Sequence, residues 1–151
     1  MLFRSDMSYF KFACKMMRGE PIDVFNHGDM ERDFTYVDDI VEAICRMLPR
    51  IPQPAAQAAL DHSAAAAHRI YNVGHHTPEP LMKLIGLMEQ NLGMKAHTVM
   101  KPMQPGDLPA TWADVAPLMR DSGYAPTTSL EEGIARFVHW FKQHPEFHAL
   151  A

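Results

Sequence analysis

The amino-acid sequence predicts an α/β fold of about five helices with short strands between them. Several segments place apolar residues at the 3.6-residue spacing of an amphipathic helix, and shorter segments alternate apolar and polar residues as half-buried strands do. In addition, 151 residues with 47% hydrophobic content are enough for one ordinary core. The sequence contains no internal repeat, and no long part of it differs in composition in a way that would indicate a second domain. We therefore expect a single domain over residues 1–151.

The N-terminal part of the sequence predicts a helix followed by two strands. The apolar residues of the helix recur at helical spacing: Met7, Phe10, Cys14 and Met17. Asp6 is placed as the N-cap of this helix and Gly19 as its end. The alternating segment PIDVF predicts a strand over 22–25, and NHGD follows with the residues of a turn. A second short strand is predicted over 33–36, with Arg32 at its start.

The middle of the sequence predicts a helix, an insertion and another strand. The apolar residues of the helix are Val37, Ile40, Val41, Ile44 and Leu48. Asp38 and Asp39 fall in its first turn, where the helix dipole favours negative charge. Residues 49–68 are rich in proline and alanine and lack large apolar residues at a regular spacing, which indicates a flexible, exposed insertion. The segment RIYNV then predicts a strand over 69–73.

Three helices and a strand are predicted in the remaining sequence. Thr77 and Pro78 supply an N-cap and a first-turn proline for a helix over 77–92. A strand over 96–100 and a short helix over 114–120 follow.

The last predicted helix has the clearest N-terminal signal, a capping box formed by Ser129 and Glu132. It stops before Pro145. Its apolar stripe consists of Leu130, Ile134, Phe137, Val138 and Phe141.

The composition excludes several classes of protein. The formal net charge of −4 and the pI near 6.1 argue against nucleic acid as a partner, because nucleic-acid binders usually carry a clustered basic face. No apolar run approaches the roughly 20 residues of a membrane span, and the N-terminus lacks the apolar region of a signal peptide. We expect a cytoplasmic protein without a membrane span. Cys14 and Cys45 are predicted to be reduced residues on buried helix faces.

Most familiar patterns for catalysis and metal binding do not fit the sequence. His75 and His76 form the one tight pair among nine histidines, and no convergent set of further ligands accompanies them. No serine is flanked by the glycines of a nucleophile elbow, and neither a G-x-G-x-x-G motif nor a P-loop is present. The remaining candidates are Arg32 and the loop from Gln104 to Asp107.

Both candidates also have a simpler interpretation. Arg32 can bind a phosphate through bidentate hydrogen bonds, or it can form a surface ion pair with Asp29, Glu31 or Asp33. Asp107 can contact a ligand, or it can simply complete a Pro-Gly-Asp turn. The residues alone leave these alternatives open.

Four segments stand in order along the chain: GEPIDVFNHGDMERDFTYVDDIVEAI, RIYNVG, QPGDLPATWAD and GYAPTTSLEEGIARFVHWF. Together they resemble the C-terminal part of NAD-dependent epimerases and dehydratases of the extended short-chain dehydrogenase type. The resemblance is strongest to bacterial UDP-glucuronate 4-epimerases, and it covers nearly the whole chain except residues 49–68. It implies a small, mixed α/β C-terminal domain that binds a UDP-sugar for polysaccharide biosynthesis.

The resemblance implies a role for three residues near the first strand. Arg32 matches the arginine of an R-D-F/Y motif that contacts the UDP diphosphate, and the neighbouring acidic residues are expected to hold it. Asp23 and Phe25 match a strand that lies against the uracil, largely through its backbone.

Three further residues are implied at other places in the chain. Asp107 matches a P-G-D loop that helps hold the ribose and phosphate region, and Gln104 stands where related enzymes often have arginine. The segment FRSDM resembles a G-R-P-D-M element, which makes Arg4 a candidate for the uronic carboxylate. Phe3 and Ser5 depart from that element.

The family features that bind NAD and perform the chemistry are missing from this sequence. The resemblance implies an N-terminal Rossmann domain with a glycine-rich turn, and a catalytic Tyr-x-x-x-Lys pair. None of the four tyrosines has lysine at the fourth following position: Tyr9, Tyr36, Tyr71 and Tyr124. We therefore expect a domain that binds a UDP-sugar but neither binds NAD nor catalyses epimerisation alone.

Two alternatives to an isolated domain remain. The chain can be one half of a split epimerase that complements a separately encoded Rossmann subunit, or it can reflect a misassigned start codon or a pseudogene remnant. In the isolated chain, an apolar face that packs on the Rossmann domain in this family would be exposed, so we expect poor solubility or self-association. An authentic homodimer is not expected, because the resemblance implies dimerisation through helices of the missing half.

Overall fold

The computed structural model describes residues 7–50 and 69–148, and these contain five α-helices. The helices are α1 (Ser8–Met17), α2 (Val37–Met47), α3 (Leu81–Leu92), α4 (Ala116–Ser122) and α5 (Leu130–Gln143). The strands are β1 (Ile22–Val24), β2 (Glu31–Arg32), β3 (Glu79–Pro80), β4 (Thr98–Met100) and β5 (Ala110–Thr111). Two 3₁₀ turns complete the described elements: η1 (Phe25–Gly28) and η2 (Pro145–Phe147).

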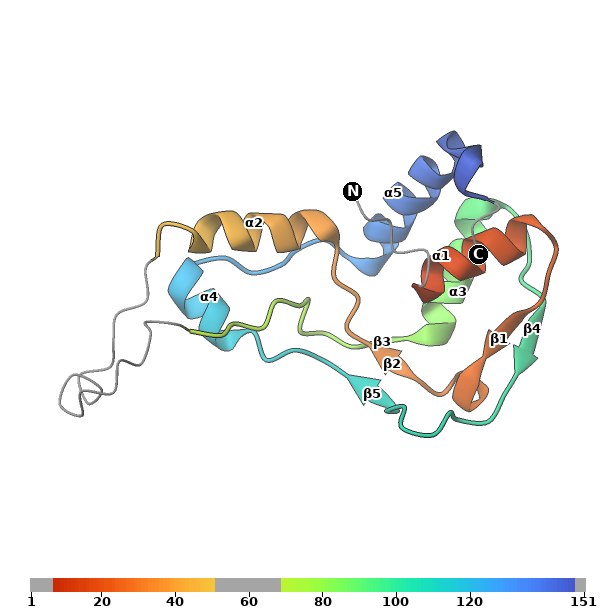
Figure 1. Cartoon of the computed structure of the whole chain (residues 1–151), viewed down its shortest axis with the longest axis horizontal. Helices are drawn as coiled ribbons and strands as arrows, with labels where there is room; N and C mark the ends of the chain where they lie inside the picture. The colour runs from red at the N-terminus through yellow and green to blue at the C-terminus, as the bar shows by residue number, and fades with distance from the viewer. Residues whose placement is uncertain (1–6, 51–68, 149–151) are drawn as a thin grey trace.

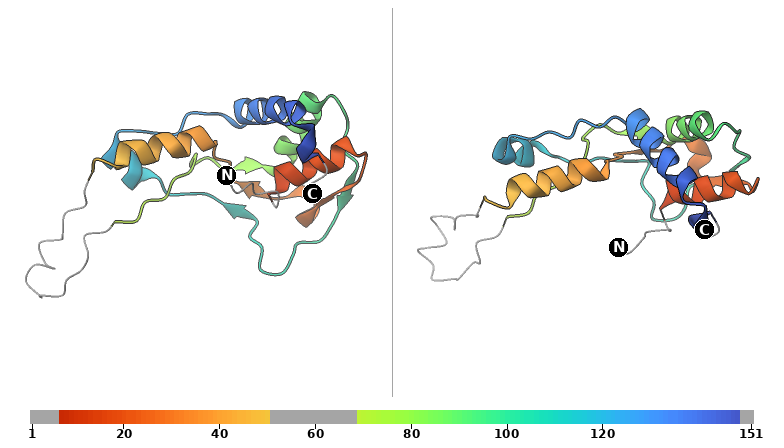
Figure 2. Two further views of the ribbon diagram at one scale, coloured as in Figure 1. Left: turned by 45° about the horizontal axis from the view of Figure 1, so that its top comes forward. Right: turned by 90° about the horizontal axis from the view of Figure 1, so that it is seen from above.

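The molecule is elongated, with helices at both ends and strands β2, β3 and β5 between them (Figure 1). Helices α1, α3 and α5 gather at one end, beside β1 and β4, whereas α2 and α4 lie at the other. The additional views in Figure 2 show the same separation. The mixed α/β class predicted from the sequence is therefore confirmed.

The strands form two small sheets in the described part of the chain. In the first, β1 pairs in parallel with β4, and Ile22 lies opposite Thr98. In the second, β2 lies between β3, to which it is antiparallel, and β5, to which it is parallel. Strands of two or three residues make too few ladder hydrogen bonds to be stable alone, so the surrounding side chains must help to hold them in register.

The hydrophobic core lies at the end that holds α1, α3 and α5. Phe10 of α1 and Phe141 of α5 are buried and meet edge to face, with ring centroids 5.6 Å apart. Leu84 and Met88 of α3 and Ile22 of β1 fill the space beside them. This core explains why the apolar stripes of α1, α3 and α5 form stable helices.

Helix α5 begins as the sequence predicts. The Ser129 hydroxyl accepts a hydrogen bond from the Glu132 backbone N–H at 3.2 Å. The helix ends at Gln143, before Pro145, and buries four residues of the predicted stripe: Leu130, Ile134, Val138 and Phe141.

Helix α2 forms where the sequence predicts it, but its apolar stripe is not covered. It packs against α4, and its buried residues are Asp39 and Ala43. Four residues of the stripe are exposed: Val37, Val41, Ile44 and Leu48. Periodicity specifies which residues share a helix face, but it does not specify what covers that face.

Several predicted boundaries are wrong. Strand β2 occupies Glu31–Arg32 rather than 33–36, so Arg32 ends a strand instead of preceding one. Residues 69–73 form no strand, because none of the described strands pairs with them. Helix α3 begins at Leu81 rather than at 77, since Glu79 and Pro80 pair with β2 as β3.

Two further predictions differ from the structure. Met7 is the N-cap residue of α1 instead of Asp6, which lies outside the described residues. Cys14 is buried as predicted, whereas Cys45 is exposed, since the buried residues of α2 are Asp39 and Ala43. The predicted insertion at 49–68 also lies almost entirely outside the described residues.

None of the helices in the described ranges combines the length and the apolar character that a membrane span requires.

Candidate functional site

Arg32 and Asp107 form an ion pair, although 75 residues separate them in the sequence. Arg32 Nη2 donates a hydrogen bond to Asp107 Oδ1 at 2.8 Å. The Arg32 and Asp107 side chains are 27% and 35% exposed, so a solute can reach both of them. Arg32 and Asp107, which were predicted as candidates from separate segments of the sequence, therefore lie in contact.

The register of two strands and a tight turn produce this contact. Arg32 lies opposite Thr111 in the parallel pairing of β2 with β5. Asp107 lies three residues before β5, in a turn closed by a hydrogen bond from its N–H to the Gln104 carbonyl at 3.1 Å. Gly106 has φ +83° within this turn, a value that favours glycine. The Asp107 carboxylate also accepts a bond from the Leu108 N–H at 2.9 Å, which fixes its orientation.

The guanidinium of Arg32 is held from one side by backbone oxygens. Nη1 donates to the carbonyl oxygens of Glu31 (2.8 Å) and Pro109 (3.2 Å). With the bond to Asp107, three of the five guanidinium N–H groups are used, which leaves two without a protein partner in the described residues. Two free N–H donors on a partly exposed guanidinium cation suit an anion such as phosphate.

The predicted role of the neighbouring acidic residues is wrong. None of the hydrogen bonds of the Arg32 guanidinium goes to the side chain of Asp29, Glu31 or Asp33. The carboxylate that holds Arg32 comes instead from Asp107, because the pairing of β2 with β5 brings that distant turn to the guanidinium.

The Asp33 carboxylate binds three backbone N–H groups instead. Oδ1 accepts from His75 at 2.8 Å, and Oδ2 accepts from His76 at 3.1 Å and from Ala113 at 3.0 Å. Gly74 permits this approach, since a Cβ there would lie 2.6 Å from Asp33 Oδ2 and 2.7 Å from the Ala113 Cβ. This role of Asp33 and Gly74 was not predicted from the sequence. The RIYNVG segment contained its signal, a glycine directly after a predicted strand.

Asp23 lies at an open edge of the first sheet. The Ile22 N–H donates to the His97 carbonyl, and the Val24 carbonyl accepts from the Lys101 N–H, so these residues face β4. The intervening Asp23 therefore points its backbone N–H and carbonyl to the opposite edge, which no described strand covers. The Asp23 carboxylate lies 3.8 Å from Lys101 Nζ.

The remaining candidate residues are less constrained. Phe25 is half-buried and begins η1 rather than belonging to the strand, and the next two residues adopt left-handed conformations. Gln104 is exposed at the start of the turn that contains Asp107. Arg4 lies outside the described residues.

Comparison with known proteins shows which family the chain resembles over its length. Residues 3–74 match the model of the NAD dependent epimerase/dehydratase family. A probable UDP-glucuronate 4-epimerase of Rhizobium meliloti strain 1021 is 42% identical over 146 residues, which cover 93% of this chain. The chain belongs to the NAD-dependent epimerase/dehydratase family.

Other members of the epimerase/dehydratase family agree with this assignment. UDP-glucuronate 4-epimerase 2 of Arabidopsis thaliana is 36% identical and matches 91% of this chain. A crystal structure of UDP-glucuronic acid 4-epimerase from Bacillus cereus, in complex with UDP-glucuronic acid and NAD, matches 93% of this chain with a TM-score of 0.74 and 26% identity.

The chain spans less than half the length of these epimerases. It corresponds to 42% of the R. meliloti protein, 32% of the A. thaliana protein and 41% of the B. cereus chain. The match lies in the C-terminal portion of the epimerase/dehydratase structures, as the sequence resemblance implied.

The residues of this epimerase/dehydratase chain do not fit the dinucleotide that its family binds. A pyrophosphate cradle needs closely spaced glycines between a strand and a helix N-terminus. The eight glycines of this sequence are scattered, and none of them forms a G-x-G-x-x-G motif. In the described residues, no group of three or more His, Cys, Asp or Glu side chains could hold a metal ion.

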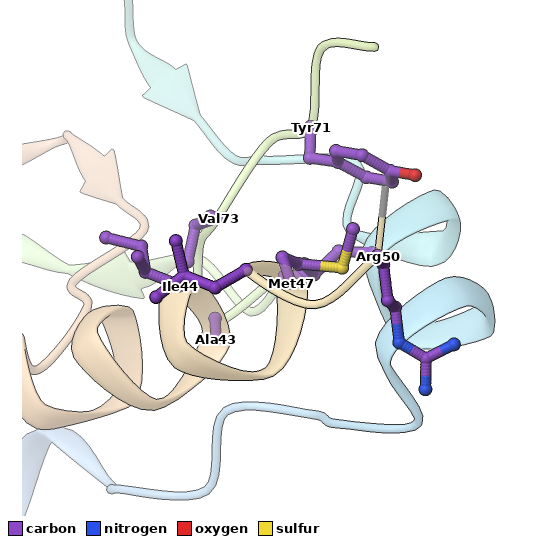
Figure 3. Close-up of a pocket in the computed structure, with 8 residues that line it drawn as sticks. Ala43, Ile44, Met47, Arg50, Tyr71 and Val73 are labelled. Carbon is purple, nitrogen blue, oxygen red and sulfur yellow. The ribbon is translucent and has the colours of Figure 1, made fainter. Parts of the chain in front are cut away.

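A separate apolar cavity of about 510 Å³ lies between α2, α4 and the segment 69–73. Figure 3 shows Ile44 and Met47 of α2 on one side of it, with Tyr71 and Val73 on the other. Arg32 and Asp107 do not line this cavity. Its apolar walls continue the uncovered stripe of α2 and provide little polar specificity for a nucleotide sugar.

Proposed function

We propose that this chain forms the UDP-sugar-binding part of a nucleotide-sugar 4-epimerase that interconverts UDP-glucuronate and UDP-galacturonate. The observation that carries this proposal is the 2.8 Å contact between Arg32 and Asp107, which assembles a partly exposed cation beside a carboxylate. The similarity to UDP-glucuronate 4-epimerases over more than nine-tenths of the chain supports the choice of substrate.

Each candidate residue has a role in the proposed site. The free guanidinium N–H groups of Arg32 bind the diphosphate, and the Asp107 carboxylate accepts hydrogen bonds from the ribose hydroxyls. The open backbone edge at Asp23 pairs with the uracil, against which Phe25 lies. Gln104 supplies a neutral amide beside the ribose and phosphate region.

Arg4 is proposed to bind the uronic carboxylate. A charge-assisted bond from this arginine would favour a uronate over a neutral hexose.

The redox chemistry of the family belongs to NAD, which supplies the hydride acceptor when it is bound. Because the residues of this chain fit neither NAD nor a Tyr-x-x-x-Lys base, we propose that the chain alone binds a UDP-sugar without converting it. This function is proposed to take place in the cytoplasm.

Titration calorimetry with UDP tests the proposed site. Replacing Arg32 by alanine removes a charge-assisted hydrogen bond to phosphate, so UDP binding should weaken by about 1.5–3 kcal/mol. Arg120→Ala is the matched control, since it removes the same charge from an exposed arginine outside the site. Unchanged affinity in Arg32→Ala, or equal losses in both variants, would contradict the proposal.

A second candidate function is the complementing half of a split epimerase. The exposed apolar stripe of α2 favours it, because such a face normally packs against another protein surface. Its occupant would be a separately encoded subunit with the NAD-binding motif and the catalytic tyrosine. Mixing the two purified products should then produce epimerase activity that neither shows alone, and no activity from the mixture would exclude this function.

A further inference from the structure

The pairing that brings Arg32 to Asp107 depends on a very small sheet. β2, β3 and β5 contain two residues each, so β2 makes only a short ladder with each neighbour. A slip by one residue would turn the Arg32 side chain to the other face of the sheet. Something beyond the ladder must fix the register of β2.

The Asp33 carboxylate lies where it can provide this restraint. It follows β2 directly and binds the Ala113 N–H, two residues after β5. It also binds the N–H groups of His75 and His76, which precede β3. One side chain therefore ties the central strand to the chain beside both of its neighbours.

Gly74 is the second part of the same arrangement. It is buried, and a Cβ at this position would lie within 2.7 Å of both Asp33 Oδ2 and the Ala113 Cβ. Separations under 3.0 Å are not tolerated without displacement. A methyl group at Gly74 would thus push the carboxylate away from the amides that it binds.

Building on the proposed diphosphate-binding role of Arg32, we infer that Asp33 is a positioning residue. It does not contact the ligand. It fixes the register of β2, and so it holds the Arg32 guanidinium where the Asp107 turn and a diphosphate can both reach it.

Two explanations predict opposite effects on diphosphate binding when asparagine replaces Asp33. Removing a negative charge next to an anion site should strengthen diphosphate binding through Coulomb attraction. A positioning role predicts weaker binding, because the asparagine NH₂ group cannot accept the bonds that one carboxylate oxygen accepts. The sign of the change therefore separates the two explanations.

The experiment is calorimetric titration of the full chain with UDP and, separately, with uridine. Asp33→Asn should raise the dissociation constant for UDP about five- to tenfold while that for uridine stays constant, since uridine lacks the diphosphate. Gly74→Ala should also weaken the binding of UDP but not that of uridine, because the added methyl group displaces the Asp33 carboxylate. Asp29→Asn, which removes an exposed carboxylate from the same segment, is the matched control and should not weaken UDP binding.

A double-mutant cycle completes the test. In an Arg32→Ala background, Asp33→Asn should cause no further loss of UDP affinity, because the group that it positions is already absent. Gly74→Ala is tested in the same background, so the conclusion holds even if one of the two variants does not fold.

Three outcomes would overturn the inference: unchanged or tighter UDP binding in Asp33→Asn, equal losses for UDP and uridine in both variants, or additive losses in the cycle. If Arg32→Ala itself leaves UDP affinity unchanged, the proposed function fails instead, so the two failures can be told apart.

Discussion

At the scale of single residues, Asp33 and Asp39 each accept several hydrogen bonds from other parts of the protein. Asp39 is buried and accepts hydrogen bonds from the Tyr124 hydroxyl (2.6 Å) and from the Thr128 N–H (3.0 Å). Burial together with the hydrogen bond to Asp39 raises the pKa of Tyr124 to about 12, so the phenol remains a donor at neutral pH. This contact ties α2 to the segment that leads into α5.

Replacing Asp39 by alanine should lower the free energy of unfolding by about 1–3 kcal/mol at pH 7, because the half-buried donors of Tyr124 and Thr128 lose their buried acceptor. Urea unfolding measures this change. Asp38→Ala is the control, since it loses a similar interaction with the helix dipole but no buried hydrogen bond. Equal losses in the two variants would show that the buried bonds contribute nothing.

The contribution of Asp39 should also depend on pH. Burial raises its pKa, but the hydrogen bonds from Tyr124, Thr128 and Thr127 outweigh burial and leave the pKa below its ordinary value. A lowered folded-state pKa means that the stabilisation is complete above the unfolded-state pKa of about 3.9 and is lost as the pH falls through the folded-state value. The difference between wild type and Asp39→Ala should therefore shrink in acid. A difference that grows below pH 4 would contradict this sign.

At the scale of secondary-structure elements, helices with a capping signal and a covered stripe are predictable from the sequence, whereas the short strands are not. Ser129 and the stripe of α5 were sufficient to place that helix. By contrast, β2 and the expected strand at 69–73 were misplaced, because a two-residue strand is decided by its partner rather than by its own residues.

The N-cap of α5 can be tested directly. Ser129→Ala removes the acceptor of the Glu132 N–H and should cost about 1 kcal/mol of stability, whereas Ser129→Asp keeps an acceptor and should cost much less. Thermal or urea unfolding of the three proteins measures both values. Identical stabilities for the alanine and aspartate variants would argue against a contribution from the cap.

At the scale of the whole molecule, the core and the uncovered stripe of α2 lie at opposite ends (Figure 1). The sheet that carries Arg32 lies between them. The end with α2 and α4 is stabilised by specific polar contacts, such as the bond from the Tyr71 hydroxyl to Asp121 at 2.7 Å. An exposed apolar stripe beside an apolar cavity is expected to promote self-association of the isolated chain.

Val41→Lys should reduce this self-association. Val41 is exposed in the middle of the stripe, and burying a valine contributes about 1.5 kcal/mol, so the dissociation constant of the associated form should rise roughly tenfold. Sedimentation velocity over a range of concentrations measures it. Gln90→Lys on α3 adds the same charge elsewhere, and equal behaviour of the two variants would show that α2 is not the contact surface.

Local sequence patterns were enough to predict the mixed fold class and the stripes of the long helices, and to make Arg32 and Asp107 candidates for the site. These features depend on local periodicity, capping chemistry and short motifs, all of which are written in neighbouring residues. Tertiary structure alone decided that Asp107 holds Arg32 and that Asp33 binds the backbone near Gly74. Tertiary structure also decided that α2 presents its apolar face outward. The physical reason is that a carboxylate accepts hydrogen bonds from the donors that lie near it. Which donors lie near it depends on the pairing of strands that are far apart in the sequence.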